Sequence, residues 1–114
     1  MSMTLPPVPQ RLREMLKDYP EHIQRLREVL NRIVEAPSHG VDPFDRAIWL
    51  LEGRLETFIA EAREELKAAE ACGDEEAVEA AKAKEAVMFR ARSPNGGLAD
   101  LDDLFAYCRG SLEK

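Results

Sequence analysis

Histidine and carboxylate side chains are the residues of this chain whose types could support metal or acid–base chemistry. A di-iron helical bundle needs Glu-x-x-His pairs on facing helices. The chain has two histidines, and neither fits this pattern. His22 directly follows Glu21, and His39 stands four residues after Glu35. The sequence therefore predicts no metal site, and no other pattern in it indicates a cofactor.

Nucleophilic chemistry has no better support. Cys72 stands in the most acidic part of the chain, where a reactive thiolate is disfavoured, and Cys108 falls on an apolar helical face as a small core residue. The Asn-Gly-Gly at residues 95–97 has the glycines of a phosphate-binding loop, but it lacks the flanking strand and the Lys-Ser/Thr pair. It predicts a turn, and we expect that the protein is not an enzyme.

Basic residues near the start of the chain raise the alternative of nucleic-acid binding. Within residues 11–35, two short helices are predicted to meet at a tight turn near Pro20, as in a helix-turn-helix. Acidic residues alternate with the basic ones, however, and residues 1–40 hold six basic and five acidic side chains. The whole chain carries a net charge of −6, whereas nucleic-acid binders are usually basic. A small nucleic-acid-binding regulator is therefore the alternative hypothesis.

The elements that must position these residues are all predicted to be helical. Apolar residues recur at helical spacing, and no stretch alternates as a strand does. In the segment at residues 37–43, which is predicted to be a loop, Asp42 is placed to cap the next helix and Pro43 to occupy its first turn. Proline and glycine divide the chain into five predicted helices, at about residues 9–18, 20–36, 43–72, 74–92 and 98–109.

The two longest of these helices are predicted to form an antiparallel hairpin over residues 43–72 and 74–92. The first has thirty residues and a length of about 45 Å. When the chain is folded back at Gly73, the apolar stripes of the two helices match without a shift. A length of 114 residues fits one domain. We therefore predict a single all-α domain, a helical bundle with a long hairpin and short flanking helices.

Bulky apolar residues are unevenly spread, which predicts a head and an arm. They cluster in residues 9–59 and 87–109, the head, whereas residues 60–86, the arm, hold ten alanines and only two branched aliphatic residues. Acidic residues also gather towards the arm, where they form either a solvated face or a surface that attracts a partner with a basic surface. These residues are Glu61, Glu64, Glu65, Glu70, Asp74, Glu75, Glu76 and Glu79.

Large side chains that point away from the predicted buried faces are candidate interface residues. Gly53 stands one turn after Trp49 and would leave a notch beside the indole. Either the flanking helices cover these side chains, or they anchor an interface, where Trp and Arg are enriched. The flanking helices are too short to cover them as well as the main stripe, so we expect a homodimer centred on the first half of the long helix. The candidates are Arg46, Trp49, Leu50, Gly53 and Phe89.

Location follows from what the sequence lacks. Its longest apolar run covers only residues 47–51, and its start has neither a basic nor an apolar signal region. Two cysteines cannot form a disulfide scaffold. We therefore expect a cytoplasmic protein with no membrane partner. The function predicted is a non-enzymatic protein–protein interaction module, or a small regulatory adaptor, that acts through helical surfaces as a homodimer.

Overall fold

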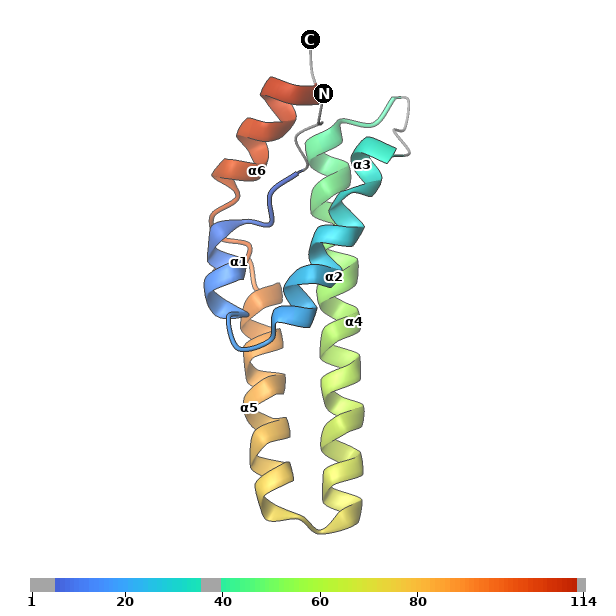
Figure 1. Cartoon of the computed structure of the whole chain (residues 1–114), viewed down its shortest axis with the longest axis vertical. Helices are drawn as coiled ribbons and strands as arrows, with labels where there is room; N and C mark the ends of the chain where they lie inside the picture. The colour runs from blue at the N-terminus through green and yellow to red at the C-terminus, as the bar shows by residue number, and fades with distance from the viewer. Residues whose placement is uncertain (1–5, 36–39, 113–114) are drawn as a thin grey trace.

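The computed structural model describes residues 6–35 and 40–112 of the chain, with side chains up to residue 110. No strand occurs within these ranges, and the all-α prediction is confirmed. The long hairpin of α4 and α5 dominates the molecule (Figure 1). The helices are α1 Gln10–Met15, α2 Pro20–Leu30, α3 Arg32–Glu35, α4 Pro43–Cys72, α5 Glu75–Arg92 and α6 Asp102–Tyr107, followed by a π-helical turn at Cys108–Leu112.

The ends of α4 lie where the sequence predicts them. The carboxylate of Asp42 accepts a hydrogen bond from the backbone N–H of Asp45 at 3.3 Å. Gly73 ends the helix with a φ of 72°, a left-handed conformation that glycine adopts without a steric penalty. Asp74 then caps α5 by accepting bonds from two first-turn N–H groups, at 3.1 and 3.2 Å. Two successive residues therefore reverse the chain.

Helices α4 and α5 pack side by side, close to the predicted register. The Nζ of Lys84 lies 3.0 Å from both carboxylate oxygens of Glu65, and the Nε of Arg92 lies 3.0 Å from Oε2 of Glu56. The buried residues of α5 are Ala81, Met88 and Ala91. Ala77 is half-buried, whereas Ala80, Ala83 and Ala86 are exposed. Alanine occurs all round α5, so the sequence pattern did not separate the buried alanines from the exposed ones.

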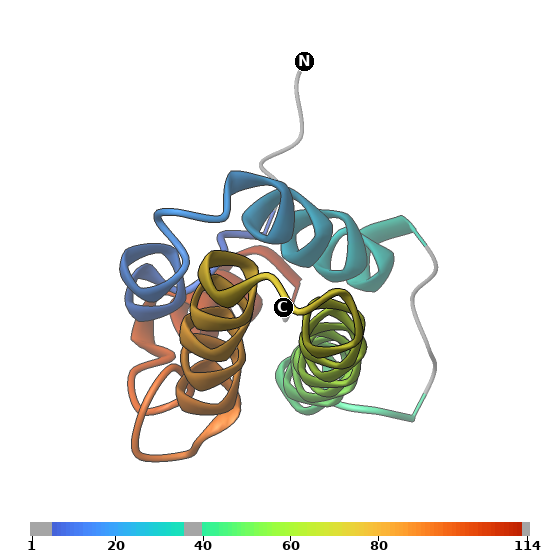
Figure 2. The same cartoon turned by 90° about the horizontal axis from the view of Figure 1, so that it is seen from below.

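Most of the core lies where α1, α2 and α6 surround the first half of α4 and the end of α5 (Figures 1 and 2). Phe58 is its largest fully buried side chain. The rings of Phe44 and Phe105 meet edge-on, with 4.9 Å between centroids, and join α4 to α6. Cys108 is buried, as predicted. The other large, fully buried hydrophobic side chains are Leu12, Leu16, Leu26, Leu30, Leu51, Leu55, Met88 and Leu104.

The Asn-Gly-Gly segment forms a turn, as predicted, and this turn packs the end of α5 against α1. Gly97 lies so close to Leu12 and to the carbonyl of Ala91 that any side chain at this position would overlap them. The Nε of Arg11 donates a hydrogen bond to the carbonyl oxygen of Gly96 at 2.8 Å. Close packing of the backbone therefore explains the glycines.

Three predicted helices have different bounds in the structure. The helix predicted at residues 9–18 covers only Gln10–Met15, and a turn follows it. The helix predicted at residues 20–36 is divided into α2 and α3, and residues 36–39, which include His39, lie outside the described residues. The helix predicted at residues 98–109 begins only at Asp102, because the preceding glycine turn continues further than its pattern indicated. The carboxylate of Asp100 accepts a hydrogen bond from the Asp102 N–H at 3.2 Å and marks this start.

Past the start of α2, in the direction of the turn at Gly73, α4 and α5 continue without the other helices beside them (Figure 1). The molecule measures 55 Å along its longest axis and 27 and 22 Å along the others. Near the start of α2, Arg25 pairs with Glu61, and Lys84 approaches the Tyr19 ring at 5.7 Å. The arm is therefore partly covered near its base. The division into a head and an arm stays a prediction.

His22 is a polar side chain within the core. It is 8% exposed, its ring meets Phe58 edge-on at 4.4 Å, and its Nε2 has no hydrogen-bond partner among the described residues. Burial lowers the pKa of His22 below the ordinary value of 6.5, and the positive charges of Lys84 and Arg25 lower it further. Protonation of this imidazole is therefore less favourable in the folded chain than in the unfolded chain.

Folding stability should decrease as the pH falls below about 6.5. The unfolded chain binds a proton at His22 more readily than the folded chain does, so acid favours unfolding. Urea unfolding between pH 5 and 8 measures this dependence. His22→Phe should remove most of it, whereas the matched variant His39→Gln should retain it. An unchanged dependence in His22→Phe would assign the titration to another group.

Candidate interaction surface

Trp49 lies on the surface of α4, with 64% of its area exposed. The residues of α4 on the opposite side, such as Leu51 and Leu55, are fully buried. The interpretation in which the flanking helices cover the indole is therefore wrong. An exposed tryptophan leaves a large apolar area in water, which is costly unless something covers it.

A groove of about 250 Å³ lies beside the indole, between α2 and α4. Gly53 opens it, because a Cβ at this position would meet no atom within 4 Å. The notch predicted next to Trp49 is therefore present. Its lining residues are Val29, Arg32, Trp49, Leu50, Gly53, Arg54 and Thr57.

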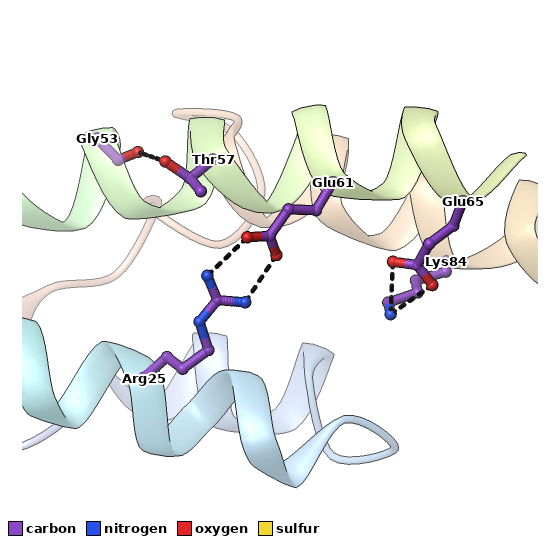
Figure 3. Close-up of polar contacts among 6 residues, drawn as sticks. All are labelled: Arg25, Gly53, Thr57, Glu61, Glu65 and Lys84. Atoms are coloured by element: carbon purple, nitrogen blue, oxygen red, sulfur yellow. Dashed lines mark hydrogen bonds and ion pairs between the residues drawn. The ribbon is translucent and has the colours of Figure 1, made fainter. Parts of the chain in front are cut away.

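The groove combines apolar walls with a positively charged rim. Val29 is buried and Leu50 is half-buried. The hydroxyl of Thr57 donates a hydrogen bond to the carbonyl oxygen of Gly53 at 3.1 Å, so its polar group is used within the helix (Figure 3). Arg32 and Arg54 form no ion pair with any residue in the described part of the chain. A partner that is both apolar and acidic would complement this surface.

An ion pair one helical turn away holds α2 in place beside the groove. Two nitrogens of Arg25 bond the two carboxylate oxygens of Glu61 at 2.7 and 2.8 Å (Figure 3). These hydrogen bonds lower the pKa of Glu61 below its ordinary value and raise that of Arg25. Val29 follows Arg25 by one turn on α2, so the pair fixes the position of that wall of the groove.

The other predicted interface residues are placed differently. Phe89 is 44% exposed on α5 and lies beneath the guanidinium of Arg63, at 4.9 Å. It does not line the groove, and neither does Arg46, which is half-buried on α4. The structure thus brings together Trp49, Leu50 and Gly53 from the predicted set.

Acidic side chains surround the free end of the hairpin. Towards the head, Glu61 pairs with Arg25 and Glu65 pairs with Lys84. Glu64, further along α4, lies 3.6 Å from Lys67. At the turn itself, the exposed carboxylates are those of Glu70, Asp74, Glu75, Glu76 and Glu79. A shallow hollow at this end is lined by Glu70, Gly73, Glu75, Val78 and Glu79.

Several basic side chains of residues 11–35 make contacts within the chain. Arg11 bonds the carbonyl of the glycine turn, as described above. Arg13 donates a hydrogen bond to the carbonyl oxygen of Val8 at 3.0 Å and lies 3.9 Å from Asp103. Arg25 pairs with α4. Arg11 and Arg13 thus make contacts between segments of the head, and Arg25 joins α2 to α4.

Searches with the chain against protein-family models, curated proteins and solved structures found no match. Across the described residues, no helix has the length and apolar character needed to cross a membrane. The same part of the chain holds no group of three or more side chains that could bind a metal ion. The groove beside Trp49 and the charged side chains are therefore the features that bear on function.

Substitutions at Gly53 and Trp49 should have little cost for the folded chain. Gly53→Ala should raise the free energy of unfolding by about 0.5–1 kcal/mol, because alanine favours a helix interior and the space is open. Trp49→Ala should change it by less than about 0.5 kcal/mol, as at other exposed sites. Phe58→Ala, in the core, should cost about 3–5 kcal/mol.

Urea unfolding at low protein concentration, where association does not contribute, measures these values. A cost of several kcal/mol for Trp49→Ala under those conditions would contradict the placement of the indole on the surface.

Proposed function

We propose that this chain is a non-enzymatic protein-interaction module that acts through its helical surfaces, without a cofactor, as a homodimer. The observation that supports it is the exposed Trp49 beside the apolar, arginine-rimmed groove. Exposed apolar patches with a polar rim are typical of interaction sites, and tryptophan and arginine are the residues most enriched among interface hot spots. The same features suit a small adaptor that joins other proteins.

Self-association follows from the shape of this surface. It carries both an exposed side chain, Trp49, and an unfilled groove, and a second copy related by a two-fold axis can cover both. The first half of α4, which carries Trp49 and the groove, is therefore the proposed recognition surface. Cys72 and Cys108 form no disulfide, which suits a reducing, cytoplasmic location.

The acidic end of the hairpin is a second candidate surface, and it fits a partner with a basic surface. Its carboxylates at Glu70, Glu75 and Glu79 are exposed and surround one hollow. Association through such charges is fast and weakens with salt, whereas apolar contacts depend little on salt. Salt dependence therefore separates the two surfaces experimentally.

Sedimentation equilibrium over micromolar concentrations tests the homodimer. The wild-type chain should approach twice its monomer mass, and Trp49→Ala should weaken the dimer by at least about tenfold, as expected for a hot spot. Phe89→Ala removes an exposed aromatic side chain outside the groove and is the matched control.

A wild-type monomer at high micromolar concentration would contradict the proposal. Loss of association in Phe89→Ala instead of Trp49→Ala would move the interface to α5. Strong, salt-sensitive retention of the wild-type chain on heparin would favour the alternative, a nucleic-acid-binding regulator that uses residues 11–35.

A further inference from the structure

We infer that the groove beside Trp49 binds the acidic hairpin end of a second copy of this chain. This inference rests on the proposed homodimer and names the segment that fills its groove. Charge complementarity supports the choice of occupant. The groove has Arg32 and Arg54 among its lining residues, and the hollow at the hairpin end has Glu70, Glu75 and Glu79.

The indole does not fill its own groove because of the direction of helical side chains. Each Cα–Cβ bond of an α-helix tilts towards the helix N-terminus. The Trp49 side chain therefore leans over the preceding turn of α4 and leaves the backbone at Gly53, one turn later, uncovered. Only a segment from outside this surface can enter the space and cover the indole at the same time.

Direct pairing of two such grooves is opposed by charge. It would bring the guanidiniums of Arg32 and Arg54 in one copy towards those of the partner, with no intervening carboxylate among the lining residues. Like charges brought together in an interface disfavour association. The hairpin end supplies the missing carboxylates, and Val78, half-buried in its hollow, supplies apolar area for the indole.

In a dimer with one two-fold axis, each of the two grooves can bind the hairpin end of the other copy. About 30 Å of helix separates Gly53 from Gly73. If two hairpins lie antiparallel with the axis midway between these positions, the groove of each copy meets the hairpin end of the other. The two identical contacts close the dimer, so no further copies are added. The arrangement also covers the part of the hairpin that extends beyond α2.

Charge reversal tests this arrangement. The groove variant carries Arg32→Glu and Arg54→Glu, and the end variant carries Glu75→Lys and Glu79→Lys. Each variant alone should dimerise at least about tenfold more weakly than the wild type, because two like-charged surfaces then meet. A chain with all four substitutions should dimerise again, because both charges are reversed together. An equimolar mixture of the groove and end variants should form a heterodimer.

The control variant, Glu14→Lys with Glu21→Lys, makes the same change in net charge as the end variant at exposed positions outside both surfaces. Sedimentation should find its dimer unaffected, and circular dichroism should find every variant helical. Equal weakening in the control and the end variant would attribute the effect to net charge and overturn the inference.

Failure of the inference and failure of the homodimer have different signatures. If the wild type dimerises through Trp49 but neither charge variant weakens it, the homodimer stands and the hairpin end is not its occupant. If the wild type stays monomeric, both fail. Growth into larger assemblies would replace the closed two-fold pair by an open head-to-tail chain.

Discussion

The length of α4 is the constraint on which the rest of the structure depends. Thirty residues give about 45 Å of helix, and every part of its apolar stripe must be covered by something. α5 covers one side of the helix, and α2 covers part of a second side, where Arg25 pairs with Glu61. The remaining short helices gather at the head. The chain therefore leaves both the far end of the hairpin and the outer face of α4 in contact with water.

The two uncovered regions differ in chemistry, and this difference gives the surface its proposed role. Near the short helices, the indole of Trp49 is exposed beside a groove whose lining includes the guanidiniums of Arg32 and Arg54. At the hairpin end, α4 and α5 pack through alanine side chains, and the exposed residues include several carboxylates. A protein that only needed solubility would not require an exposed tryptophan next to a helix glycine. Gly53 lowers helix stability at an open position, so its presence suggests that the space matters.

Much of this fold was predictable because its signals are local. Asp42, Gly73 and Asp74 act on the backbone within a few residues, so the ends of the two long helices could be placed from the sequence. The periodicity of the leucines on α4 likewise fixed the buried face. On α5 the prediction was weaker, because alanines on all sides carry no information about which of them is buried.

The candidate surface was only half predictable. Trp49 and its glycine notch lie on one helix, where spacing is enough to bring them together. Val29 and Arg32 belong to α2, and their part in the groove depends on how that helix docks on α4. The ion pair that fixes this docking, between Arg25 and Glu61, joins residues 36 positions apart. No short-range pattern identifies such a pair.

Fluorescence of Trp49 tests the central claim most directly, because it is the only tryptophan of the chain. Its indole is exposed in a single copy and is covered in the proposed dimer. The emission maximum should move to shorter wavelength as the protein concentration rises through the range in which the sedimenting mass doubles. A maximum typical of an indole in water at every concentration, including those at which a dimer forms, would contradict the account.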